Sequence, residues 1–178
     1  MNYHDITKCD MLNGDGLRVV LWVAGCSHHC KGCQNKQTWR RDSGILCDEE
    51  AKKELFEALK PDYISGITFS GGDPLYLYHR REILELIKEL KNLFPNKTIW
   101  LYTGFTLEEI IKWSIGEELL SYIDVLVDGK FILEERDPNL QWVGSPNQRV
   151  IDVQKTLNSS TIVKHCEVYY EKYKGKRY

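Results

Sequence analysis

The sequence predicts an α/β fold with a mainly parallel sheet, because strand-like apolar runs alternate with helical patterns along the chain. The chain has 178 residues, of which 42% are hydrophobic and 28% charged, and this composition suits one globular domain with its own core. Unusual turns follow three of the expected strands. Since ligands of open α/β sheets bind beyond the carboxyl ends of the strands, we expect the functional site at that edge.

The expected strands are four apolar runs that are rich in β-branched and aromatic residues. They cover residues 17–24, 66–70, 98–102 and 123–127. The run 17–24 is taken as the first strand of the sheet. Because helical patterns separate these runs, successive strands are expected to be parallel neighbours.

Two long helical patterns lie between the expected strands. Residues 49–60 place their apolar side chains on one face, with Asp48 as the N-cap and Pro61 beyond the end. Residues 80–94 repeat apolar side chains at helical spacing and predict a buried stripe. The stripe consists of Ile83, Leu86, Ile87, Leu90 and Phe94.

A capping box predicts a further, short helix near the middle of the chain. Thr106 is followed three residues later by Glu109, so that each side chain can bind the backbone N–H of the other residue. The segment after Phe131 carries no pattern that assigns it to a helix or a strand.

Three cysteines lie within eight residues, at Cys26, Cys30 and Cys33. A cubane iron–sulfur cluster that only carries electrons is normally held by four thiolates, whereas a metal centre that reacts needs an open coordination position. Three thiolates therefore favour a catalytic cluster. A zinc knot with His28 or His29 as the fourth ligand is the alternative. Otherwise the two histidines are interpreted as polar residues of the loop that covers the cluster.

A double glycine follows the strand expected at 66–70. Gly71 and Gly72 allow the backbone to approach a ligand closely, and Asp73 could accept hydrogen bonds from an ammonium group. The same residues before Pro74 are also ordinary turn chemistry, so this motif alone does not establish a ligand site.

Two charged residues, Asp128 and Lys130, follow the strand expected at 123–127. The ends of parallel strands meet at one edge, so this turn is expected near the cysteine loop. Ligand contacts and a solvated strand end are both consistent with these two residues.

The composition argues against several function classes. The formal net charge is -2, and no strongly basic surface that would bind nucleic acid is indicated. The N-terminal segment has no signal-peptide pattern, and no apolar run approaches the about 18 residues of a membrane span. We therefore expect a cytoplasmic protein. In that reducing compartment Cys9, Cys47 and Cys166 are expected to be plain thiols, buried or partly exposed.

Six segments in a fixed order carry a family resemblance. They are residues 13–18, 26–39, 70–75, 100–105, 125–131 and 144–149. Together they resemble the activating proteins of anaerobic ribonucleoside-triphosphate reductases, which are radical S-adenosylmethionine (SAM) enzymes. The similarity covers about residues 1–152, and so many ordered matches are hard to obtain by chance.

The resemblance implies a small, incomplete (βα) radical SAM barrel over residues 1–152 and a C-terminal extension of uncertain structure over 153–178. It also implies one 4Fe-4S cluster held by Cys26, Cys30 and Cys33, with SAM on the remaining iron. The residues that match SAM-binding positions are Gly32, Cys33, Gln34, Gly71, Gly72, Asp73, Thr103, Asp128 and Lys130. No catalytic side chain is expected beyond the cluster and SAM.

The activity that the resemblance implies is that of an oxidoreductase. It would cleave SAM reductively to a 5′-deoxyadenosyl radical and form a glycyl radical on the large subunit of the reductase. The electron would come from a low-potential donor such as flavodoxin. Neither nucleic acid nor a membrane is expected as a partner.

Other functions stay open at this point. Within the same enzyme class, the chain could activate another glycyl-radical enzyme, such as pyruvate formate-lyase. The matches at 144–149 and at Asn35 and Trp39 favour the reductase. From other classes, a zinc-binding interaction module or a small electron carrier would also explain the cysteines.

Overall fold

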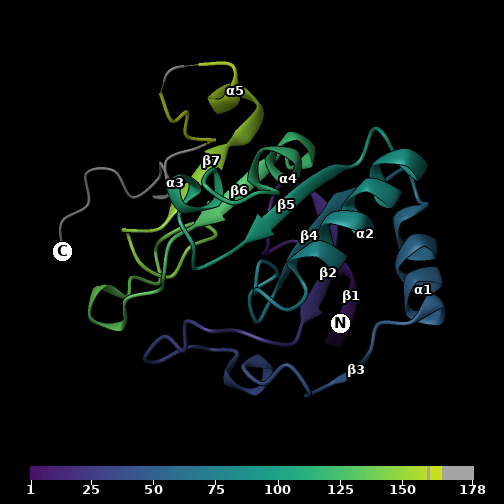
Figure 1. Ribbon diagram of the computed structural model, residues 1–178, viewed down its shortest axis with the longest axis horizontal. Helices are drawn as coiled ribbons and strands as arrows, with labels where there is room; N and C mark the ends of the chain where they lie inside the picture. Colours follow the sequence, from purple (N-terminus) through teal and green to yellow (C-terminus); the bar gives the residue numbers. More distant parts are fainter. Residues whose placement is uncertain (160, 166–178) are drawn as a thin grey trace.

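The structure is a computed structural model that describes residues 1–159 and 161–165, and Cys166 therefore lies outside the described residues. Its sheet has seven strands in the order β3-β1-β2-β4-β5-β6-β7 (Figure 1). The strands are β1 (Asn2–Asp10), β2 (Leu17–Val23), β3 (Ile45–Leu46), β4 (Ile64–Gly71), β5 (Thr98–Tyr102), β6 (Val125–Asp128) and β7 (Arg149–Asp152). The pairs β2–β4, β4–β5 and β5–β6 are parallel, whereas β1 and β7 run antiparallel to their neighbours. The α/β fold with a parallel central sheet is confirmed.

The four expected strands are all present as β2, β4, β5 and β6. The prediction that the run 17–24 forms the first strand is wrong, because β1 precedes it and pairs with it as an antiparallel neighbour. Only Tyr3 and Ile6 of β1 are buried, and the other residues of this strand are polar or partly exposed. A strand with so few apolar residues lacks the continuous run that identified the others.

The helices cover one face of the sheet. They are α1 (Glu49–Leu59), α2 (Arg80–Leu93), α3 (Leu107–Ile110), α4 (Gly116–Tyr122) and α5 (Val153–Leu157), and two short 3-10 helices occupy Lys36–Thr38 and Leu133–Glu135. The Asp48 side chain accepts hydrogen bonds from the backbone of Glu50 and Ala51, so the expected N-cap of α1 is confirmed. The capping box of Thr106 and Glu109 at α3 is confirmed as well.

The main hydrophobic core lies between this helical layer and the sheet. Alternate strand residues such as Leu101 and Leu126 point into it and meet the buried stripe of α2. Ile83, Leu86, Ile87 and Leu90 of the expected stripe are buried, and Phe94 packs against the core from a partly buried position.

The opposite face of the sheet is covered by a loop instead of helices. Trp100, Val125, Val127 and Val150 form a small cluster there, against which Trp142 and Val143 of the segment after β6 pack. This face also buries a charged side chain. Arg18 is 0% exposed, and it donates hydrogen bonds to the Thr68 hydroxyl over 2.8 Å and to the Ile67 carbonyl over 2.7 Å.

The described residues beyond 152 pack against the antiparallel end of the sheet. Val153 in α5 is buried, and Lys164 forms an antiparallel bridge with Ile151. The His165 backbone N–H donates to the Val150 carbonyl over 2.8 Å. In the described part of the chain, no helix has both the length and the apolar character that crossing a bilayer requires.

Candidate functional site

Four turns meet at the carboxyl edge of the parallel strands. The cysteine loop, residues 26–33, follows β2, the turn Gly71–Asp73 follows β4, residues 103–105 follow β5, and residues 128–130 follow β6. Figure 1 shows the long loops after β2 and β6 at the same end of the sheet. This is the edge at which α/β proteins bind ligands, as the sequence predicted.

The double glycine brings the second turn against the start of the cysteine loop. Gly71 adopts φ +105°, in the left-handed region that favours glycine. A Cβ on Gly72 would lie 2.5 Å from the Gly25 carbonyl oxygen. The Asp73 backbone N–H donates to the same oxygen over 2.8 Å. The glycines are therefore needed for the close approach of two backbone segments.

Asp73 is enclosed by the turns around it. Its carboxylate accepts hydrogen bonds from the Thr103 hydroxyl over 2.9 Å, the Gly104 backbone N–H over 3.0 Å and the Leu75 backbone N–H over 2.8 Å. The Asp73 side chain is 1% exposed. The structure thus brings Asp73 and Thr103, two of the predicted SAM-binding residues, into direct contact.

His28 completes the surroundings of Asp73. Its Nε2 lies 2.7 Å from Asp73 Oδ2, without the alignment of a regular hydrogen bond, and its side chain is only 6% exposed. The ring stands edge-on against the Phe105 ring at a centroid distance of 4.4 Å. This burial was not predicted, because the contacts come from turns that are distant along the chain.

The three cysteines of the loop are half-buried and unpaired. Burial raises the pKa of the Cys26 thiol to about 11 and also raises the pKa of the Cys30 thiol. The His28 backbone N–H opposes this effect at Cys26, since it donates to Sγ over 3.4 Å. The Asn35 backbone N–H donates to Cys33 Sγ over 3.3 Å. Such amide donors stabilise thiolate sulfur, as they do around iron–sulfur clusters.

The side chains of the cysteine loop suit a cubane cluster and not a single metal ion. Within residues 1–159 and 161–165, no three side chains of His, Cys, Asp or Glu are arranged to hold one metal ion. A cubane cluster does not require three ligands that converge on one ion, because each thiolate binds its own iron atom. Three thiols on one loop, with amide donors directed at Cys26 and Cys33, provide ligands of the right chemistry.

A cavity of about 270 Å³ opens beside Cys33 on the face of the sheet that lacks helices. Strand residues form its floor, and the loop after β6 forms its other wall. The lining residues are Asn13, Trp22, Cys33, Gln34, Asn35, Ser70, Tyr102, Phe131, Trp142, Val143, Gly144 and Gln148. Of the predicted SAM-binding residues, Cys33 and Gln34 therefore face this cavity. Sequence analysis did not identify Trp142 or Val143, which come from the unassigned segment.

The segment 144–149 fixes the wall of this cavity. The Gln148 side chain accepts from the Gly144 backbone N–H over 2.9 Å and donates to the Gly129 carbonyl over 3.0 Å. Asn147 donates to the Lys130 carbonyl over 2.8 Å. One of the motifs behind the family resemblance thus ties the covering loop to the turn after β6.

Asp128 and Lys130 differ in their surroundings. Asp128 is 0% exposed and accepts a hydrogen bond from the Leu107 backbone N–H over 2.8 Å, so a solvated strand end is the wrong interpretation for this residue. Lys130 is exposed, and its positive charge partly offsets the rise that burial causes in the pKa of Cys30. Gly32, within the cysteine loop, adopts φ +73° against the Leu133 side chain.

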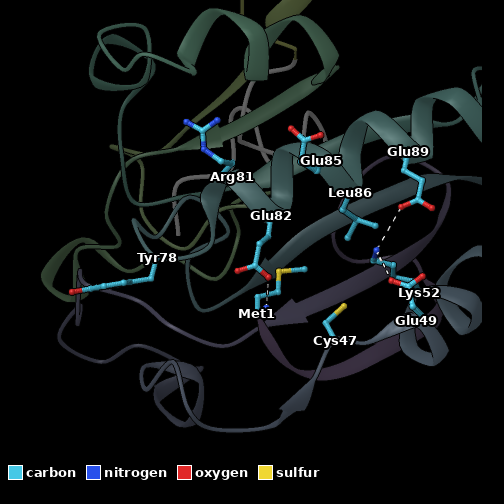
Figure 2. A pocket seen from close by; sticks show the side chains of 10 residues that line it. All are labelled: Met1, Cys47, Glu49, Lys52, Tyr78, Arg81, Glu82, Glu85, Leu86 and Glu89. Atoms are coloured by element: carbon cyan, nitrogen blue, oxygen red, sulfur yellow. Dashed lines mark hydrogen bonds and ion pairs between the residues drawn. The ribbon is translucent and has the colours of Figure 1, made fainter.

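A second cavity, of about 600 Å³, lies between the N-terminus, α1 and α2. Figure 2 shows that Glu82, Glu85 and Glu89 of α2 line it together with Cys47. None of the predicted site residues lines this cavity. Cys47 is half-buried, as expected for a plain thiol, and Cys9 is exposed on β1.

Comparison with known proteins agrees with this geometry. A family described as a 4Fe-4S single cluster domain matches residues 12–151. A protein of Vibrio cholerae is 45% identical over 150 residues, which is 83% of this chain and 96% of the relative. A protein of Enterobacteria phage T4 is 46% identical over 84% of this chain and 93% of its own length. A protein of Escherichia coli K12 is 41% identical over 84% of this chain and 97% of its own length.

All three relatives are named anaerobic ribonucleoside-triphosphate reductase-activating proteins. The matched region includes the four turns, the cysteine loop among them, and the loop that covers the cavity. This match favours an iron–sulfur centre over a zinc knot. The chain belongs to the family of anaerobic ribonucleoside-triphosphate reductase-activating proteins and contains a 4Fe-4S single cluster domain.

Proposed function

We propose that this chain forms a glycyl radical on the large subunit of an anaerobic ribonucleoside-triphosphate reductase, with SAM as the source of the radical. The observation that carries the proposal is that the cysteine loop starts against the turn Gly71–Asp73, where the Asp73 N–H donates to the Gly25 carbonyl, and ends at the cavity that Cys33 lines. The names and the coverage of the relatives support the choice of partner.

The proposed chemistry is a one-electron reduction followed by hydrogen transfer. The 4Fe-4S cluster, when bound and reduced, supplies one electron that breaks the bond between the SAM sulfur and its 5′ carbon. Methionine and a 5′-deoxyadenosyl radical are the products of that step. The radical then takes the α hydrogen of a glycine, which leaves 5′-deoxyadenosine and a glycyl radical. A low-potential donor such as flavodoxin provides the electron.

Each part of the edge has a proposed role toward SAM. Gly32, Cys33 and Gln34 would lie along the molecule, and the backbone of Gly71 and Gly72 would hold its amino group. The enclosed Asp73 carboxylate, together with Thr103, holds this turn in place.

The turn after β6 takes a different part in the proposal. Asp128 accepts from the first backbone N–H of α3 and so fixes the strand end. Lys130 adds positive charge near Cys30, where a cluster with thiolate ligands carries negative charge.

The cavity beside Cys33 is the proposed reaction space. Aromatic and aliphatic side chains, such as those of Trp142 and Val143, bound one side of this space and would limit the access of water to a carbon radical. The target glycine of the partner would enter here, because a residue without a side chain fits a narrow space.

The proposal includes the finer organisation of the chain. The parallel strands β2, β4, β5 and β6 would correspond to an incomplete (βα) barrel. Residues 1–152 would form the radical SAM domain, and residues 153–178 would form the C-terminal extension. The protein would act in the cytoplasm as an oxidoreductase.

The test is anaerobic reconstitution with iron and sulfide, followed by reduction in the presence of SAM and the large reductase subunit. Chromatography measures 5′-deoxyadenosine, and electron paramagnetic resonance (EPR) measures the glycyl radical. Both products are expected from the unaltered chain. Cys30→Ala should abolish both, whereas Cys9→Ala, which removes an exposed thiol on β1, should leave both unchanged.

The same experiment separates the alternatives. If 5′-deoxyadenosine forms but only pyruvate formate-lyase acquires the radical, the partner is wrong and the SAM chemistry stands. A protein that holds zinc after anaerobic purification, or that holds iron without cleaving SAM, would overturn the proposal.

A further inference from the structure

The His28 side chain joins three turns that are far apart in the sequence. It belongs to the cysteine loop after β2, and its Nε2 lies 2.7 Å from Oδ2 of Asp73 in the turn after β4. Its ring contacts the Phe105 ring in the turn after β5 at a centroid distance of 4.4 Å. In the described structure it is thus a side-chain link between the cluster-binding loop and the other turns of this edge.

The contact between His28 and Asp73 is shielded from solvent. The His28 side chain is 6% exposed and that of Asp73 is 1% exposed, so solvent does not compete with the imidazole for the carboxylate in the intact chain. The contact places the imidazole edge against the carboxylate, with 2.7 Å between Nε2 and Oδ2, and an N–H at this position is attractive to the carboxylate oxygen. A shorter side chain would withdraw from Asp73 Oδ2 and remove this contact.

Gly104 provides the space for the imidazole ring. A Cβ on Gly104 would lie 2.4 Å from Cδ2 and 2.7 Å from Nε2 of His28. Gly104 does not have a positive φ, so its backbone conformation accepts alanine. The absence of a side chain at residue 104 is therefore explained by the ring of His28.

We infer that His28 is a positioning residue, which fixes the cysteine loop relative to the turn Gly71–Asp73 so that the cluster iron and the amino-group site engage one SAM molecule together. This inference rests on the proposed function. SAM would contact both segments at once, through the iron that the loop holds and through the backbone of the glycine turn. A shift of one segment relative to the other weakens both contacts, since binding through two points requires a fixed spacing.

His29 is the matched control because it belongs to the same loop and lacks these contacts. Its side chain stacks on Trp39 at a centroid distance of 4.6 Å, and the residue is exposed. Its φ is 46°, a conformation that asparagine tolerates well. His29→Asn and His28→Asn therefore introduce the same side chain at neighbouring positions with different surroundings.

The first measurement is SAM affinity of the anaerobically reconstituted full chain. We expect His28→Asn to retain the iron and sulfide content of the unaltered chain. Its Kd for SAM should rise about 10-fold to 100-fold, which is the usual effect of losing a residue that orients metal-site groups. The change that SAM causes in the EPR spectrum of the reduced cluster should be lost at concentrations that saturate the unaltered chain. His29→Asn should change neither quantity.

A conservative variant and a double variant test whether the imidazole ring itself causes the effect on SAM affinity. His28→Gln keeps an N–H donor near the position of Nε2 and should recover part of the affinity. Gly104→Ala should weaken SAM binding in the unaltered background, because its Cβ pushes the ring away. In the His28→Ala background it should have no further effect, since the ring is gone.

A measurement without SAM tests the role of His28 separately from the proposed function. Hydrogen exchange of the cluster-loaded protein should be faster in residues 26–33 and 101–105 of His28→Asn than in His29→Asn. If the unaltered chain fails to bind SAM, the proposed function is wrong, and the exchange rates still decide whether His28 holds the loop. Unchanged SAM affinity and unchanged exchange in His28→Asn would overturn the inference, as would loss of the cluster in both His28→Asn and His28→Gln.

Discussion

Arg149 is paired with Asp128 across the last two strands of the sheet. The two residues are opposite each other in the antiparallel register of β6 and β7, and Arg149 Nε donates to Asp128 Oδ1 over 2.8 Å. The other side of the guanidinium holds Glu108 of α3 in a bidentate pair at 2.9 and 2.8 Å. One side chain thus connects the buried end of β6 to α3 and to β7.

Removal of Arg149 should therefore destabilise the fold. Arg149→Met leaves the Asp128 carboxylate buried without its charged partner, and we expect a loss of about 3 kcal/mol in the free energy of unfolding. Urea denaturation followed by circular dichroism measures it. Glu108→Gln removes only the exposed half of the network and should cost less than about 1 kcal/mol. Equal losses in the two variants would contradict this interpretation.

The Glu108 pair also predicts a pH dependence. Hydrogen bonds from Arg149 lower the pKa of the Glu108 carboxyl from its ordinary value of 4.5 to about 2. A lowered pKa in the folded state gives a stabilisation that is complete above the unfolded pKa and is lost as the pH falls through the folded pKa. The stability difference between the unaltered chain and Glu108→Gln should shrink between about pH 5 and pH 2. Denaturation midpoints over this range measure it, and a difference that stays constant would show that the pair is not formed.

The N-cap of α1 offers a local test of the fold. Asp48→Ala removes the acceptor for the backbone N–H groups of Glu50 and Ala51, and it should cost about 1 kcal/mol in the free energy of unfolding. Lys53→Ala changes an exposed residue of the same helix and should have little effect. Denaturation curves of the two variants, compared at one pH, decide between a real cap and a neutral position.

The glycine turn should tolerate no side chain at residue 72. Gly72→Ala places a Cβ 2.5 Å from the Gly25 carbonyl oxygen and 2.9 Å from that of Thr38, so the cysteine loop must move. We expect a loss of about 1 to 3 kcal/mol in stability, together with weaker SAM binding. Ser27→Ala, at an exposed position in the cysteine loop, is the control. Wild-type affinity in Gly72→Ala would argue against a role of this turn in SAM binding.

The wall of the cavity should govern how efficiently the radical is used. Trp142 stands edge-on against Trp100 at a centroid distance of 4.8 Å and lines the space beside Cys33. Trp142→Ala opens this space, so more 5′-deoxyadenosine should form for each glycyl radical on the reductase. The ratio of the two products measures this effect. Trp142→Phe keeps an aromatic wall and should keep a ratio close to that of the unaltered chain.

The sequence predicted the elements whose signals are local. The strands β2, β4, β5 and β6 and the helices α1 and α2 follow from apolar runs, periodicity and the cap at Asp48, all of which short segments contain. The strands β1 and β7 escaped prediction. The first has only two buried residues, and the second has four residues whose place depends on pairing with β6.

The sequence signals of the candidate site are local in the same way. The cysteines and the glycine turn are recognisable from spacing and from their positions after strands. The burial of His28 depends on Asp73 and Phe105, and the role of Trp142 depends on Trp100, so neither signal exists in one segment. The charge of Asp128 is evident from the sequence, whereas its pairing with Arg149 is evident only from the register of β6 and β7.

The division of the sheet into a helical face and a loop-covered face has a consequence for how this family can diversify. The main hydrophobic core lies under the helices, whereas the cavity beside Cys33 is bounded by the loop after β6. Substitutions in that loop can reshape the proposed entrance for a partner while the main core stays intact. Recognition of new partners can therefore evolve on one side of the sheet with little loss of thermal robustness.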